Sequence, residues 1–370
     1  MKLFSYKHRP VHLGPYPLER LKRQHALPDL GAPRSASGLL LAAMVAVLTT
    51  ASANAQFDLK GKTVTIYIGG GAGGGVDIFA RTFAHHLPQH LPGEPQVVVS
   101  NMPGNGGIQA VQFAYNVAAK DGTAIGTTNA GPVVEPLMGG AFVGNYDLTK
   151  FRWIGSLLKG DTVCAVWHGS RTKTLDDARV QDVVMASTGA TSAPLRSALL
   201  MNALIGTRFK PISGFHVGNA LLAIERGEVE GICNTLSSMR TTRADWLRDS
   251  KLVPLVQVAM TADAAFAHVP RAIDMIRSVE QRQMLEFFLL PYEFNNPYYL
   301  PPGASDEALA TYRKAFSAVM ADPAYSNDAL KRGQNLAPKT GEEVERLVAQ
   351  LFGTPKDIIR RTIEATTPKH

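Results

Sequence analysis

The sequence predicts an α/β fold with two lobes, and three observations support this prediction. Short runs of β-branched residues alternate with stretches whose apolar residues recur at helical spacing. The turns after the first predicted strands are rich in glycine, as is typical where parallel strands pass into helices. The alternation then begins again near residue 183 without any repeated sequence, which indicates two successive α/β units.

The first unit is predicted to run strand, helix, strand, helix, strand. Its strands are expected near 63–69, 97–99 and 124–128, and its helices near 76–90 and 108–119. Right-handed crossovers make such strands parallel and place their glycine-rich turns at one edge of the sheet.

The rest of the chain is predicted to hold a second α/β unit followed by a helical region. Strands are expected near 153–155, 162–167, 183–187, 209–212, 229–233 and 252–258, with helices near 193–205, 218–226 and 236–247. The carboxyl-terminal helices are expected near 280–290, 305–321, 324–332, 341–351 and 355–364.

Residues 1–55 are predicted to be a leader removed on export. The apolar run Leu39–Leu48 is too short to span a membrane and suits a signal-peptide core, and Ala53-Asn54-Ala55 fits cleavage after Ala55. An uncleaved membrane anchor is the alternative. The leader carries a net charge of +5, which leaves +2 of the chain's +7 for residues 56–370. The basic balance therefore does not indicate a nucleic-acid partner.

The two cysteines, Cys164 and Cys233, are too few for a disulfide scaffold. In an exported protein they form either one disulfide or two buried thiols, and the sequence leaves both open.

The stretch Lys62–Asp77, KTVTIYIGGGAGGGVD, reads as a buried strand that passes through glycines into a helix. Backbone N–H groups at the start of a helix attract anions, and glycines let a ligand approach the backbone closely. No Gly-Lys-Ser/Thr sequence follows the loop, which argues against a phosphate-binding loop and favours a small carboxylate. A flexible turn without a ligand is the alternative.

The predicted ligand site gathers turns that follow strands in both units. We expect it to include Ala72, Gly73, Gly74, Gly75, Asn105, Gly106, Gly107, Thr128 and Asn129 from the first unit, and Thr188, Gly189, Ala190, Thr191 and Ser192 from the second.

We expect no catalytic residue, no metal and no cofactor. The pair His86 and His90 has the spacing of metal ligands, but a solvated helix face explains it better because no HExxH pattern accompanies it. Asp77 is predicted to cap and brace the glycine loop and to pair with Arg81.

Three further groups of side chains are candidates for ligand contacts. Arg196, Arg240 and Arg243 are each predicted to be surface charges, although an acidic ligand is the alternative partner. Ser187 is predicted, with Ser192, to donate hydrogen bonds to a ligand. Tyr298 and its neighbour Tyr299 are predicted to pack a crossover segment rather than to stack on a ligand.

Four segments, in order, resemble the periplasmic receptors of tripartite tricarboxylate transporters, the Bug-type solute-binding proteins. GAGGGVDIFAR (Gly71–Arg81) resembles the family's PxGGGTDxxAR, and NMPGNGG with the later KDGTAIG is similar to NRPGAGG…PDGYTLL. SGFHVGNALLAIERGEVEGIC resembles the segment ending in GGQVDLMF, and PPGASDEALATYRKAFSAVMADPAY resembles PAGTPxxxVxxLNxAxxxALxDPxV. The similarity covers about residues 62–340.

The resemblance implies a type II periplasmic binding-protein fold whose two lobes close on an organic acid for delivery to a membrane permease. It implies carboxylate binding by backbone N–H groups of the first two glycine loops. Two polar positions of the family's second lobe are Leu195 and Ala223 here, so we expect an anionic ligand held by neutral donors.

The expected organisation is lobe 1 at 56–160, lobe 2 at 161–260 and a second part of lobe 1 at 261–370. The expected protein is a periplasmic monomer and not an enzyme. An exported two-lobed enzyme acting on a small anion and a subunit that presents its ligand to a sensor are the alternatives.

Overall fold

A computed structural model describes residues 57–139, 146–187, 192–215 and 217–368. The chain divides into two units, Met1–Ala55 and Gln56–His370, and the predicted leader lies outside the described residues.

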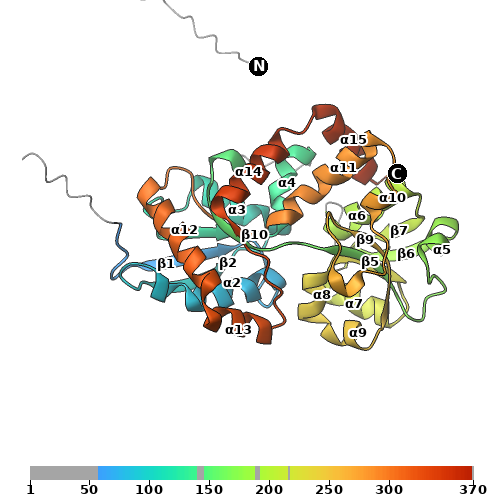
Figure 1. Ribbon diagram of the computed structural model, residues 1–370, viewed down its shortest axis with the longest axis horizontal. Helices are drawn as coiled ribbons and strands as arrows, with labels where there is room; N and C mark the ends of the chain where they lie inside the picture. The colour runs from blue at the N-terminus through green and yellow to red at the C-terminus, as the bar shows by residue number, and fades with distance from the viewer. Residues whose placement is uncertain (1–56, 140–145, 188–191, 216, 369–370) are drawn as a thin grey trace, which may run out of the picture. The chain divides into compact units, whose positions relative to one another are not determined.

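The first sheet of the second unit has six strands in the order β11-β4-β10-β3-β1-β2 (Figure 1). The neighbouring strands β3, β1 and β2, which end at the β2 edge of the sheet, are parallel, as predicted, because helices connect them. The strands β10, β4 and β11 continue the sheet in antiparallel pairs. The strand bounds are Thr63–Ile68 (β1), Gln96–Asn101 (β2), Ala124–Thr127 (β3), Arg152–Leu158 (β4), Asn295–Leu300 (β10) and Lys339–Thr340 (β11).

Helices from the amino-terminal and the carboxyl-terminal parts of the sequence accompany this sheet. They are α2 (Gly75–His86), α3 (Ile108–Asn116), α4 (Ala130–Met138), α12 (Asp306–Ala321), α13 (Pro323–Lys331) and α14 (Gly341–Phe352). Helix α4 was not predicted, since Gly131 and Pro132 indicated a turn. The buried aromatic residues Phe83, Tyr298 and Phe316 pack together in the core of this part. Tyr298 and Tyr299 both lie in β10 and are almost fully buried, which confirms their packing role.

The second sheet has five strands in the order β7-β6-β8-β5-β9. Its strands are β5 (Thr162–Trp167), β6 (Val183–Ala186), β7 (Phe209–Ile212), β8 (Gly231–Thr235) and β9 (Leu252–Val258). Its helices are α5 (Leu175–Val180), α6 (Ala193–Ile205), α7 (Val217–Glu225), α8 (Leu236–Thr242), α9 (Ala244–Arg248) and α10 (Ala272–Met275). The predicted helix 236–247 is therefore two helices, because Arg243 between them leaves the helical conformation (φ −146°, ψ 50°).

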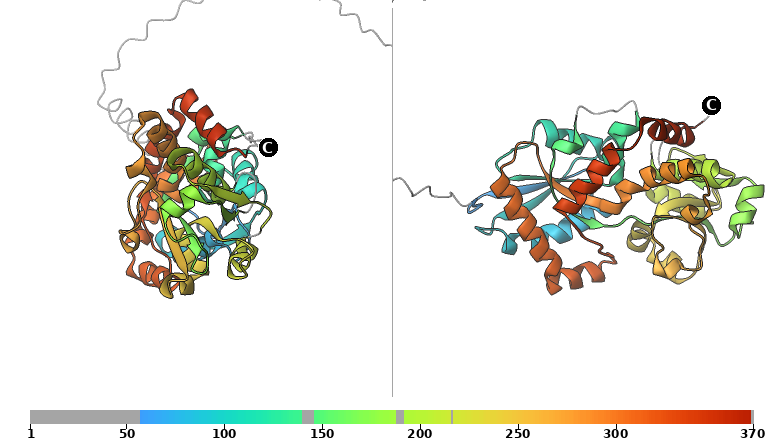
Figure 2. Two further views of the ribbon diagram at one scale, coloured as in Figure 1. Left: turned by 90° about the vertical axis from the view of Figure 1, so that its right-hand side faces the viewer. Right: turned by 45° about the horizontal axis from the view of Figure 1, so that its top comes forward.

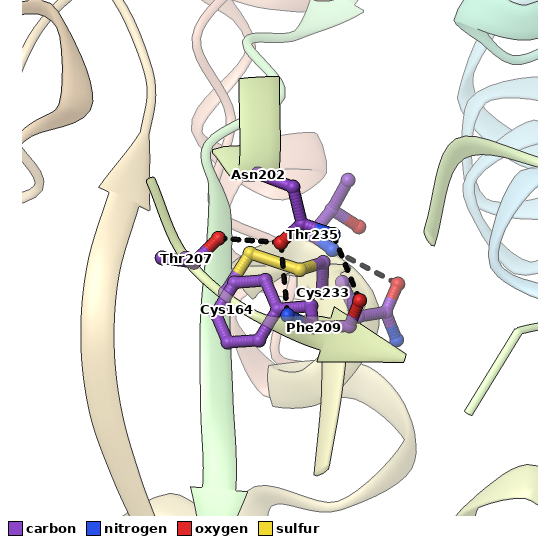
Figure 3. Close-up of a disulfide and its surroundings, with 7 residues drawn as sticks. Cys164, Asn202, Thr207, Phe209, Cys233 and Thr235 are labelled. Carbon is purple, nitrogen blue, oxygen red and sulfur yellow. Dashed lines mark hydrogen bonds between the residues drawn. A yellow bond between two sulfur atoms is a disulfide. The ribbon is translucent and has the colours of Figure 1, made fainter. Parts of the chain in front are cut away.

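Cys164 and Cys233 form a disulfide between the neighbouring strands β5 and β8 (Figure 3). Beside it, Asn202 of α6 fixes the entry to β7. Its amide oxygen accepts hydrogen bonds from the Thr207 hydroxyl at 2.7 Å and the Phe209 N–H at 2.8 Å. Of the two states that the sequence left open, the structure therefore has the disulfide.

The chain crosses from the first sheet to the second at residues 159–161, which join β4 to β5. It returns to the first sheet through α11 (Val279–Leu289) and the 3-10 helix η5 (Leu290–Phe294), which lead into β10. The last helix, α15 (Lys356–Thr366), contacts α11, α6 and α4 (Figure 2). One hydrophobic cluster runs through these helices and includes Val133, Leu204, Phe288 and Ile358. Helices that accompany the first sheet and helices that accompany the second thus share one continuous apolar core.

None of the described helices combines the length and apolarity needed to cross a bilayer.

Candidate functional site

The first glycine loop joins β1 to α2. Ala72, Gly73 and Gly74 are exposed, and Gly74 is the N-cap residue of α2 in an extended conformation (φ −74°, ψ 166°). No side chain caps this helix. The first N–H groups of a helix have no partner within the helix, so an uncapped start next to exposed glycines can donate to an anion.

Asp77 braces this loop from inside, as the sequence predicted. It is 2% exposed, and its carboxylate accepts hydrogen bonds from the Gly73 N–H at 2.8 Å, the Asn101 amide at 2.9 Å and Arg81 Nε at 3.0 Å. Burial alone would raise the pKa of Asp77, but these hydrogen bonds outweigh it and lower the pKa below its ordinary value. A carboxylate held in this way positions the loop.

The second glycine loop joins β2 to α3. Asn105, Gly106 and Gly107 follow one another with φ angles of +47°, +68° and +103°. Asn105 and Gly106 are exposed, whereas Gly107 is buried. This conformation suits glycine and asparagine, and it leaves the outer part of the loop open to solvent.

The two glycine loops and the end of β3 meet in one place. A Cβ atom on Gly69 would lie 3.0 Å from Gly107 O and 2.8 Å from Thr128 Oγ1. Thr128 is 1% exposed, and its hydroxyl has no hydrogen-bond partner among the described residues. The carboxyl ends of three neighbouring parallel strands therefore bring backbone and hydroxyl groups together, as expected for a ligand site in an open α/β sheet.

Asn129 follows Thr128 and is the N-cap residue of α4. Its side-chain oxygen accepts a hydrogen bond from the Gly131 N–H at 3.0 Å. This oxygen therefore serves the helix. The structure thus places five of the nine first-unit residues in turns between a strand and a helix, three (Asn105, Gly106 and Gly107) in the 3-10 helix η2, and Gly75 at the start of α2.

The predicted loop of the second sheet is only partly described. Residues 188–191 lie outside the described residues, and Ser192 is the N-cap residue of α6 without a side-chain capping bond. Ser187 is fully buried, and its hydroxyl lies 3.1 Å from Ile212 O and 3.0 Å from Ser213 Oγ. The prediction that Ser187 serves a ligand is therefore wrong, because its hydroxyl ties β6 to the end of β7.

Arg196 differs most from its prediction. It is 8% exposed rather than a surface charge, and its Nη2 lies 3.1 Å from Glu135 Oε2 of α4. The ion pair joins a helix of the second sheet to a helix of the first. By contrast, Arg240 pairs with Asp263 at 2.7 Å while partly exposed, and Arg243 lies over the Trp246 ring at 5.4 Å.

The two histidines of the first helical segment also have partners. His86 Nε2 lies 3.3 Å from Asp328 Oδ2, and His90 Nε2 lies 3.4 Å from Asp322 Oδ2. His86 is 8% exposed, so the predicted solvated helix face is wrong at this position. His86 of α2 thus contacts Asp328 of α13, and His90, in the 3-10 helix Pro88–His90, contacts Asp322, the N-cap residue of α13. In the part of the chain that the structure describes, no group of three or more His, Cys, Asp or Glu side chains is placed to hold a metal.

Known proteins are similar to this chain in sequence and in fold, although no family model matches it. A UPF0065 protein of Bordetella bronchiseptica is 23% identical over 317 residues, covering 84% of this chain and 89% of that protein. The periplasmic binding protein BugD has a TM-score of 0.62 at 17% identity, covering 83% of this chain and 99% of its own. MatC from Rhodopseudomonas palustris, solved with bound malate, has a TM-score of 0.62 at 19% identity, covering 80% and 98%.

These similarities confirm the two-lobed α/β fold of a periplasmic binding protein. They also confirm the resemblance to Bug-type solute-binding proteins that the four sequence motifs predicted. At 17% and 19% identity the two solved structures show a shared fold, and the UPF0065 protein is similar to the chain in sequence at 23% identity.

Proposed function

We propose that this protein is an extracytoplasmic solute-binding protein that captures a small organic acid and delivers it to the membrane permease of a tripartite transporter. One observation carries the proposal: three backbone loops converge where β1, β2 and β3 end, beside the uncapped start of α2. Such an arrangement offers N–H donors and a buried hydroxyl to a carboxylate without placing a positive side chain in the loops.

The second sheet supplies the opposite wall in this proposal. Residues 188–192 follow β6 in the sequence, as the first two glycine loops follow β1 and β2. Residues 161–260 form lobe 2, and residues 56–160 and 261–370 form lobe 1. The lobes close on the ligand by a hinge motion at the crossing segments near 159–161 and 290–294.

Export is the second part of the proposal. The leader is removed after Ala55, and the mature protein is a periplasmic monomer. The disulfide between Cys164 and Cys233 supports this location because disulfides persist in oxidising compartments such as the bacterial periplasm. The related protein BugD is also a periplasmic binding protein.

The test is a thermal-shift screen of the purified protein against mono-, di- and tricarboxylates, followed by calorimetry of the best ligand. We expect saturation at one ligand per chain, with no chemical change in the recovered acid. Conversion of the acid would instead support the exported enzyme, and absence of binding to every carboxylate would contradict the proposal. Binding without transport in a strain that holds the permease would favour the sensor subunit.

A further inference from the structure

The second glycine loop contains an Asn-Gly pair, Asn105-Gly106, and it is the one such pair in the sequence. An asparagine side chain is attacked most readily when glycine follows it, because glycine has no side chain to shield its peptide nitrogen. The motif NRPGAGG, which this stretch resembles, has alanine at the position of Asn105. The reactive pair is therefore a feature of this chain, at a turn that the proposed function uses.

Both reacting groups are accessible. Asn105 and Gly106 are exposed, and a Cβ atom added to Gly106 would meet no atom within 4 Å. Among the residues that the structure describes, none accepts a hydrogen bond from the Gly106 N–H, and none holds the Asn105 side chain. Asn105 also has a φ of +47°, in the left-handed region that few side chains adopt. The loop therefore leaves the amide of Asn105 free to meet the nitrogen that follows it.

Asn129 lies in the same candidate site and lacks both conditions. Its side-chain oxygen accepts a hydrogen bond from the Gly131 N–H at 3.0 Å, and the residue after it is Ala130, which is 3% exposed. The Cβ and the burial of Ala130 shield its nitrogen from base and from the asparagine side chain. Asn129 is thus an internal control for Asn105 within one molecule.

We propose that Asn105 is a deamidation site whose conversion switches off the candidate anion site. The Gly106 nitrogen, after losing its proton to base, forms a bond to the side-chain carbonyl carbon of Asn105, and the amide nitrogen leaves as ammonia. Water then opens the cyclic imide that results. Opening at the side-chain carbonyl gives aspartate, and opening at the backbone carbonyl gives isoaspartate. Water and base are the only reactants that the conversion needs.

Both products impair the loop as a donor of N–H groups to an anion, and this part of the inference rests on the proposed function. Each product carries a new carboxylate two residues before Gly107, which lies against Gly69 of the first glycine loop. The new charge repels an incoming carboxylate and competes for the same N–H donors. Isoaspartate also adds an atom to the backbone, which displaces a loop whose Gly107 is already in close contact.

A bound carboxylate should protect Asn105. Closure of the imide ring rotates the backbone of Asn105, and a ligand held by the N–H groups of the loop opposes that movement. Only chains without ligand then react, so a ligand at about ten times its Kd should slow the conversion about tenfold. Conversion therefore removes chains that have remained empty.

The test incubates the purified protein at mildly alkaline pH and follows each asparagine by peptide mass spectrometry, while calorimetry measures the fraction of chains that bind a carboxylate. The probes are acetate, succinate, citrate and benzoate. We expect Asn105 to convert faster than every other asparagine, Asn129 included. The fraction of chains that bind should fall in step with unconverted Asn105, and a probe that binds should slow the conversion.

Three variants separate this chemistry from general damage. Asn105→Ala removes the amide and Gly106→Ala shields the nitrogen, so each should keep its own starting fraction of binding chains through the same incubation. Asn105→Asp reproduces one product and should bind at least tenfold more weakly than the unaltered protein, at a similar melting temperature.

Four results would count against the inference. Persistence of Asn105 while other asparagines convert, or full binding after its conversion, would overturn it and leave the proposed function intact. An equal loss of binding in aged Asn105→Ala would also overturn it, because the damage would then lie elsewhere. Failure of every probe to bind freshly purified protein would refute the proposed function and, with it, the effect assigned to the conversion.

Discussion

Replacing Gly107 by alanine should destabilise the ligand-free protein more than the same change elsewhere in the glycine loops. The new methyl group would lie 2.6 Å from Gly69 O and 2.9 Å from Thr128 Oγ1, and Gly107 has a φ of +103°. The backbone strain costs about 1–2 kcal/mol, and forcing a methyl group into a packed region costs about 1–3 kcal/mol. We therefore expect a loss of about 2–5 kcal/mol in the free energy of unfolding.

Two neighbouring glycines separate the two causes. Gly106 has a φ of +68° but open space around its added Cβ, so Gly106→Ala should cost about 1 kcal/mol from strain alone. Gly71 has open space and no positive φ, so Gly71→Ala should change stability by less than about 0.5 kcal/mol.

The assay is urea unfolding of the three variants beside the unaltered protein, with the midpoint and the slope fitted for each. The account predicts losses in the order Gly107, Gly106, Gly71, with equal slopes. Equal losses in all three, or a loss at Gly107 no larger than at Gly106, would refute the close contact between the two glycine loops.

Three other predictions concern stability and processing. Because the pKa of Asp77 is lowered in the fold, its carboxylate stabilises the fold at pH values above the ordinary carboxyl range, and this contribution disappears as the pH falls below about 4. The urea midpoints of Asp77→Asn and of the unaltered protein should therefore converge in acid. A constant gap between the two midpoints would contradict this. Reducing the disulfide, which joins residues 69 apart, should lower the free energy of unfolding by about 4 kcal/mol, whereas Cys164→Ala/Cys233→Ala should not respond to reductant. Mass spectrometry of exported protein should find Gln56 at the amino terminus, and retention of Met1 would exclude cleavage.

The sequence predicted the parallel part of the first sheet well because its signals are local. The strand Thr63–Ile68 alternates buried residues with exposed or half-buried ones, and the glycine run after it leaves few alternatives to a strand–turn–helix unit. Asp77 was interpreted correctly for the same reason, since its partners Gly73 and Arg81 are each four residues away.

Helix α4 and the buried ion pair were missed for different reasons. Pro132 lies in the first turn of α4, where a missing N–H costs nothing, so the proline that indicated a turn is compatible with a helix. Arg196 and Glu135 are 61 positions apart in the sequence, and tertiary packing, in which α15 contacts both α4 and α6, brings them together. The asparagine before Ala130 is an N-cap signal that would have identified the helix.

The most direct test of the central claim is carboxylate affinity in Gly106→Val, with Gly206→Val as the matched control. Both glycines have a left-handed backbone conformation, with φ angles of +68° and +74°, and an added Cβ would meet open space at either one. Gly206 is the C-cap residue of α6, at the opposite end of that helix from its N-cap residue Ser192. The two variants should therefore lose similar stability. We predict that Gly106→Val weakens binding of the best carboxylate at least tenfold, about 1.4 kcal/mol or more, while Gly206→Val binds as the unaltered protein does. Equal affinity in the two variants would show that the carboxylate binds away from the glycine loops.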